Sequence, residues 1–238
     1  MEEGAGGCVR RNYFVNVNKD KIAKGVDVKE VYNELQTILA GIEKNYYQSV
    51  TSKKFKKIIN PSEYNIYEQI FNHPKIKLTE QKGENEIFNV QEKEWDYFET
   101  VIQIRTIKVM VECLRILSDH NEYIEAKIIE ICPSQQSGTD IRLVNKKKEV
   151  IGVEVFGGAD ARGNNKFNRD MKSLFKKKEI LVKMFACRKD AWTKNQQTEK
   201  EPKYDPKNYD YKDIIEDEHS NYIVFKVTKK NKKKVKKL

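Results

Sequence analysis

The sequence predicts an α/β fold in which helices flank a central mixed β-sheet, preceded by an N-terminal helical region. Apolar residues recur at helical spacing from residue 89 to about 118, and the pattern then becomes strand-like over 123–132 and in two runs between 138 and 158. An amphipathic stretch at 165–177 precedes a nearly all-apolar run at 179–187, which is typical of a strand buried on both faces. The predicted order is therefore helix, three strands, helix, strand, followed by a last strand at 222–227.

The N-terminal third divides into a tail and a helical region. Residues 1–26 are predicted to form a tail, and 27–90 a helical region that serves dimerisation or DNA contact. One helix is predicted to begin at Asp27, because Asp-Val-Lys-Glu has the pattern of a capping box. A second is predicted from Asn60, where Asn-Pro-Ser-Glu supplies a cap, a proline in the first turn and a returning acid.

Composition favours a soluble protein with an anionic partner. Of the 238 residues, 38% are hydrophobic and 34% charged, which fits a core of ordinary size under a charged surface. The formal net charge is +10, and seven of the last ten residues, 229–238, are lysines. This Lys-rich tail is expected to hold phosphates or another anionic surface, whereas the rest of the chain is only mildly basic.

Cysteine and histidine usage argues against a zinc site or a disulfide framework. The four cysteines and three histidines are scattered, with no paired spacing. A reducing intracellular compartment is the expectation, the cytoplasm of a prokaryote or the nucleus of a eukaryote. No run of apolar residues is long enough to cross a membrane, so a membrane is not an expected partner. A small-molecule cofactor is not expected either.

The most informative stretch is the hairpin between Gly138 and Gly158. Asp140 stands at the start of its first strand and Glu154 near the end of its second, so antiparallel pairing brings the two carboxylates together. Alternation places Glu154 and Phe156 on one face of the sheet and the neighbouring valines on the other. Two converging acids suggest a Mg²⁺ site. A hairpin with two solvated acids is the alternative.

The predicted order and the hairpin motif together resemble the PD-(D/E)XK nuclease superfamily. Within it, Gly152-Val-Glu-Val-Phe-Gly-Gly-Ala-Asp-Ala161, followed by Asn168-Arg169, is similar to a stretch of some type II restriction endonucleases. The resemblance covers about 92–187 and none of the N-terminal third. It implies a restriction-endonuclease-like core over 91–228, with a polar loop at 188–220.

The activity that the resemblance implies is hydrolysis of DNA phosphodiester bonds with Mg²⁺, for which Mn²⁺ can substitute. Asp140 and Glu154 match the two acidic positions of the family, both as catalytic residues and as metal ligands. The backbone carbonyl of Val155 is a candidate third ligand. The metal would polarise the scissile phosphate and activate a water.

The sequence departs from the family pattern at Phe156, where the family usually has a lysine. A phenyl ring can neither donate to a phosphate nor assist proton loss from water. Three explanations remain open: a lysine reaches the site from the following helix, Lys166 before Lys172; an acid such as Glu112 or a second metal substitutes; or the chain binds DNA without cutting it. Lys166 is the preferred catalytic lysine.

Double-stranded DNA is the expected partner, and cleavage of a palindromic site would require a homodimer. The polar stretch 194–212 is a candidate for base contacts. Two rival functions are a DNA- or RNA-binding module without cleavage and a repair or junction nuclease without sequence preference. The predicted DNA-binding residues, expected to contact phosphates, are Arg162, Arg169, Lys172 and Lys176.

Overall fold

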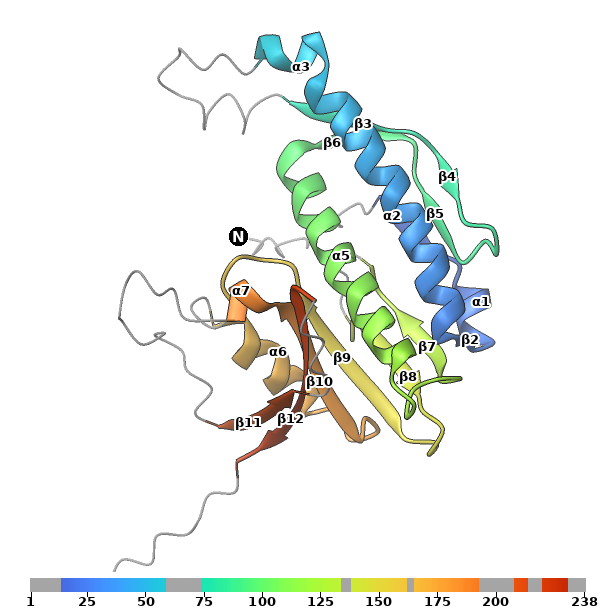
Figure 1. The fold of residues 1–238 in the computed structure, drawn as a ribbon, viewed down its shortest axis with the longest axis vertical. Helices are drawn as coiled ribbons and strands as arrows, with labels where there is room; N and C mark the ends of the chain where they lie inside the picture. The colour runs from blue at the N-terminus through green and yellow to red at the C-terminus, as the bar shows by residue number, and fades with distance from the viewer. Residues whose placement is uncertain are drawn as a thin grey trace, which may run out of the picture.

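The computed structural model describes residues 14–58, 74–133, 138–161, 165–192, 208–213 and 220–230. The helix predicted from Asn60, the DNA contact predicted at Arg162 and nearly all of the Lys-rich tail lie outside these residues, as does most of the stretch 194–212. The described part is a mixed α/β protein with a large mixed sheet flanked by helices, which confirms that part of the prediction (Figure 1). No helix in it is both long and apolar enough to cross a membrane.

The seven-stranded sheet contains all the strands predicted downstream of residue 120. Among its described strands, β9 and β10 form the one parallel pair, and the remaining pairs are antiparallel. A parallel pair needs a crossover, which here contains α6 (Lys166–Leu174). The strands lie in the order β11 (Tyr209–Asp213), β12 (Tyr222–Lys229), β10 (Val182–Arg188), β9 (Val150–Phe156), β8 (Ile141–Val144), β7 (Lys127–Ile131) and β2 (Val26–Asp27).

The two faces of the sheet carry different helices. Val153 and Val155 belong to a core cluster with residues of α5 (Tyr97–Asp119). Phe156 belongs to a second cluster with Phe167 and Met171 of α6. The predicted division of the β9 side chains is therefore correct, because a strand directs alternate residues to opposite faces. Figure 1 shows α5 lying along the sheet, with α6 beside β9 and β10.

The N-terminal region packs against α5. Helix α2 (Val28–Thr51) begins after Asp27 as predicted and contacts α5 along its length (Figure 1). The predicted capping bond of the Asp27 side chain is absent from the described structure, and its carboxylate instead pairs with Lys127 Nζ at 2.7 Å. Shorter helices are α1 (Lys19–Ala23), α3 (Lys53–Ile58) and α7 (Lys189–Trp192).

Three predictions about residues 1–97 are wrong. Residues 14–26 are not merely a tail, since they contain β1 (Val15–Val17) and α1. Part of the predicted helical region is extended. The predicted long helix begins at Tyr97 rather than at residue 89, because Asp96 caps it by accepting a hydrogen bond from the Glu99 N–H at 3.0 Å. The extended elements are β3 (Lys75–Leu78), β4 (Gln81–Lys82), β5 (Phe88–Val90) and β6 (Lys93–Asp96).

Candidate metal centre

Asp140 and Glu154 stand opposite each other across the β8–β9 pair. The register pairs Ile141 with Val153, so the preceding residue of β8 faces the following residue of β9. Residues opposite each other in an antiparallel pair project to the same face. The Val155 N–H donates a hydrogen bond of 2.6 Å to Asp140 Oδ2, which holds this carboxylate over the end of β9. The two acids therefore share the sheet face that carries α6.

Burial makes both carboxylates reluctant to ionise. Glu154 is only 7% exposed, and burial followed by repulsion from Asp140 raises its pKa to about 9. Burial raises the pKa of Asp140 to about 7, although the Val155 hydrogen bond opposes this change. Without a cation the pair retains protons at neutral pH, whereas a bound cation would favour its ionised form.

A third carboxylate, Asp170, comes from α6. Burial raises its pKa, and its charge raises the pKa of both Asp140 and Glu154, so it belongs to the same electrostatic cluster. Its Oδ1 accepts a hydrogen bond from Lys166 Nζ at 2.6 Å. Its Oδ2 is buried and has no hydrogen-bond partner among the described residues.

Two lysines bring positive charge to this cluster. Lys166, the first residue of α6, lowers the pKa of Asp140 and Glu154. Lys177, just beyond the same helix, donates to Thr139 Oγ1 and also lowers the pKa of both acids. The sequence pattern pointed to Lys166 but not to Lys177 or Asp170. The local signal for Asp170 is its place four residues after Lys166, the spacing of an ion pair on one helix face.

Phe156 occupies the position at which the superfamily resemblance implies a lysine, and it is part of the core. The residue is 8% exposed and packs in the cluster with Phe167 and Met171. A Cβ added to Gly158 would lie 2.3 Å from the Phe156 ring, so only glycine allows this approach. The position is therefore an apolar one beside the acids.

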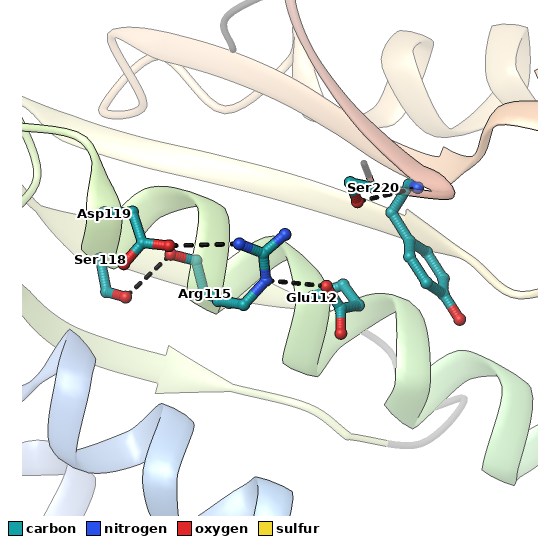
Figure 2. Close-up of polar contacts among 6 residues, drawn as sticks. Glu112, Arg115, Ser118, Asp119 and Ser220 are labelled. Atoms are coloured by element: carbon teal, nitrogen blue, oxygen red, sulfur yellow. Dashed lines mark hydrogen bonds and ion pairs between the residues drawn. The ribbon is translucent and has the colours of Figure 1, made fainter. Parts of the chain in front are cut away.

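Glu112, proposed above as a substitute acid, does not join them. It lies on α5, which covers the opposite face of the sheet. Its Oε2 accepts from Arg115 Nε at 2.9 Å, and Arg115 Nη1 also donates to Asp119 at 3.2 Å (Figure 2). This ion-pair network on α5 rules out Glu112 as a member of the Asp140–Glu154 cluster.

Three of the four residues predicted to contact DNA lie within the part of the chain that the structure describes. Arg169, Lys172 and Lys176 are all exposed on or just after α6. The apolar residues of this helix, Phe167, Met171 and Leu174, are buried against the sheet. The three basic side chains therefore point away from the core into solvent. They lie on the same face of the sheet as the acids.

The side chains present suit a Mg²⁺ ion, which needs few protein ligands, better than a cation that needs many. The described residues contain no group of three or more His, Cys, Asp or Glu side chains arranged to hold a metal ion. Mg²⁺ keeps several waters and commonly uses one or two carboxylates together with substrate phosphates. Asp140 and Glu154 would supply two such carboxylates, and the buried Oδ2 of Asp170 has no hydrogen-bond partner among the described residues.

Comparison of the chain with protein-family models, with curated proteins and with solved structures finds no match.

Proposed function

We propose that this chain is a Mg²⁺-dependent DNA endonuclease with a restriction-endonuclease-like core, and that it cuts a specific double-stranded site as a type II restriction endonuclease does. The observation that carries the proposal is the cross-strand pair of Asp140 and Glu154, two partly or fully buried acids with raised pKa values. The order α5, β7, β8, β9, α6, β10 supports it, because it is the order that the superfamily resemblance implies.

Asp140 and Glu154 would hold the metal, and the carbonyl of Val155 is a candidate third ligand. Bound Mg²⁺ supplies charge that polarises the scissile phosphate and lowers the pKa of a coordinated water. The Val155 N–H fixes one oxygen of Asp140, so the other remains for a ligand. Burial excludes bulk water from Glu154, which strengthens its attraction for a cation.

Lys166 is the residue we propose in place of the missing family lysine. Phe156 is packed in the core and has no donor, whereas Lys166 carries its ammonium group close enough to lower the pKa of both acids. Its ion pair with Asp170 fixes the direction of the side chain. The ammonium group would neutralise charge that develops on the phosphate.

Contacts with the DNA backbone would come from Arg169, Lys172 and Lys176, together with Arg162 from the preceding segment. Arg169, Lys172 and Lys176 face solvent on the side of the sheet that carries the acids, and Arg162 lies outside the described residues. A palindromic site would be met by a homodimer, since twofold symmetry in the protein matches twofold symmetry in the DNA.

A second candidate function is DNA binding without cleavage. It is favoured by one observation, the burial of Phe156 where the family has its lysine.

Incubation of supercoiled plasmid with the protein separates the two candidates. Cutting that needs Mg²⁺ or Mn²⁺, stops in EDTA and is lost in Asp140→Asn supports the nuclease. DNA binding with no cutting under either metal supports the second function. Discrete fragments from a long DNA indicate a restriction enzyme, and a smear indicates a nuclease without sequence preference.

A further inference from the structure

A basic cleft of about 660 Å³ opens at the edge of the sheet where β9 and β10 end. It lies on the face that carries α5, and so it is distinct from the cluster of Asp140 and Glu154. Four cationic side chains and a single acidic one line it. The residues that define the basic cleft are Arg105, Lys108, Arg188, Lys189, Asp190 and Tyr222.

The basic cleft adjoins the end of the strand that carries Glu154. A Cβ added to Gly157 would lie 2.6 Å from the backbone nitrogen of Thr106, so the chain leaving β9 touches α5 next to Arg105. On β10, Cys187 pairs with Phe156, and Arg188 is therefore level with Gly157. Gly157 lies three residue steps beyond Glu154 along the chain, which is about 10 Å.

The donors in the cleft suit a phosphate group. Arg105 is exposed, and no hydrogen bond or ion pair of its side chain is found within the described residues. Arg188 uses Nε and one terminal nitrogen on the exposed Asp190, which leaves further guanidinium donors. Burial raises the pKa of Tyr222, so its hydroxyl stays protonated and can also donate. A guanidinium fork matches two phosphate oxygens.

We propose that the basic cleft binds the phosphodiester backbone of a DNA strand that continues over the sheet edge to Asp140 and Glu154. The direction of the strand rests on the proposed function, but backbone binding itself does not require cleavage. The span of about 10 Å, or about three nucleotides at the rise of B-form DNA, is only the component of the path along the strand, because the cleft and the acids lie on opposite faces of the sheet. The cleft would thus hold the backbone more than about three nucleotides from the scissile bond.

The test is the affinity for a fluorescein-labelled DNA duplex, measured by anisotropy as a function of salt. All variants carry Asp140→Asn, so that no cutting occurs. Arg105→Gln combined with Arg188→Gln is expected to weaken binding about tenfold or more and to reduce the slope of log K against log[salt] by about two. Lys19→Gln removes an exposed charge on α1, at the opposite edge of the sheet, and is expected to change neither quantity.

Arg105→Lys distinguishes a charge effect from misfolding, because it keeps the charge and should restore most of the affinity. An unchanged affinity and slope in the double variant, or no duplex binding by the parent protein, would overturn the proposal that the basic cleft binds DNA. The plasmid assay is independent of this result. If the wild-type chain binds through the cleft but never cuts, only the nuclease proposal fails; if it cuts while the double variant binds normally, only the cleft proposal fails.

Discussion

Asp140 accepts a 2.6 Å hydrogen bond from the backbone N–H of Val155, directly beside the side chain of Glu154. This bond joins the start of β8 to the end of β9 and fixes the separation of two acids that repel each other. The repulsion, added to burial, is what raises the pKa of Glu154 to about 9. Folding therefore holds together a pair that favours protons or a cation, and the first three predictions follow from this.

Replacement of either acid by its amide is expected to abolish Mg²⁺-dependent cutting without loss of stability. Asp140→Asn and Glu154→Gln each remove a metal ligand, and the rate should fall by about a thousandfold or more. The melting temperature at neutral pH should stay the same or rise, because an amide is uncharged like the protonated acid and needs no proton uptake on folding. Glu112→Gln is the matched control on the other face, with cutting unchanged. Full activity in Asp140→Asn would contradict the site.

The stability of the metal-free protein is expected to fall as the pH rises. The folded pKa values of Asp140 and Glu154, about 7 and about 9, lie above those of exposed carboxylates, so the folded state binds more protons than the unfolded state. Their contribution is complete below about pH 4 and is lost progressively as the pH passes 7 and approaches 9. Mg²⁺ should oppose the loss. Chemical unfolding at pH 6 to 9.5 measures this, with the double amide variant as reference. A wild-type curve that parallels the reference at every pH would exclude the raised pKa values.

Binding of Mg²⁺ is expected to release protons. At pH 7 the metal-free pair holds about one to two protons, given its raised pKa values, and the ion must displace them. Titration calorimetry in buffers of different ionisation enthalpy counts the protons, and the affinity should increase with pH. Asp140→Asn should bind Mg²⁺ weakly. Heats that do not depend on the buffer at pH 7 would mean that the ion binds elsewhere.

Lys166→Ala is expected to reduce the rate of cutting about a hundredfold while DNA affinity changes little. The reason is that its ammonium group, held by Asp170, would contact the scissile phosphate rather than the DNA backbone on either side of it. Single-turnover cutting and duplex affinity, measured on the same variants, separate the two effects. Lys176→Ala, an exposed lysine just beyond α6, is the control and should only weaken binding slightly. Undiminished cutting by Lys166→Ala would move the role to Lys177.

Phe156→Lys is expected to destabilise the protein and to give no gain in rate. The ring packs in an apolar cluster beside Gly158, so a lysine there leaves a cavity and buries a charge, at a cost of about 3 kcal/mol or more. Phe156→Leu should cost about 1 kcal/mol and retain cutting. Chemical unfolding and plasmid cutting measure both. A large gain in rate for Phe156→Lys would instead show that position 156 reaches the scissile phosphate.

Some of the site was predictable because it depends on neighbours in sequence. The hairpin, the shared face of Glu154 and Phe156, and the opposition of Asp140 and Glu154 all follow from strand alternation and a short turn. The extended segments between residues 75 and 96 were not predicted. They are two to four residues long, too short for their alternation to be distinguished from a helical pattern.

The local sequence specifies the order of helices and strands from α5 to β10 and the two acids that face each other, since periodicity and turn chemistry act over a few residues. It did not predict α7 or β11, which lie within the stretch 188–220 that was expected to be a polar loop. Tertiary packing is what brings Asp170 and Lys177 to those acids, keeps Glu112 away from them, and places Arg105 and Arg188 in one cleft. These arrangements depend on which sheet face each helix covers. That choice is made by the burial of whole apolar clusters, and it leaves no local pattern in the sequence.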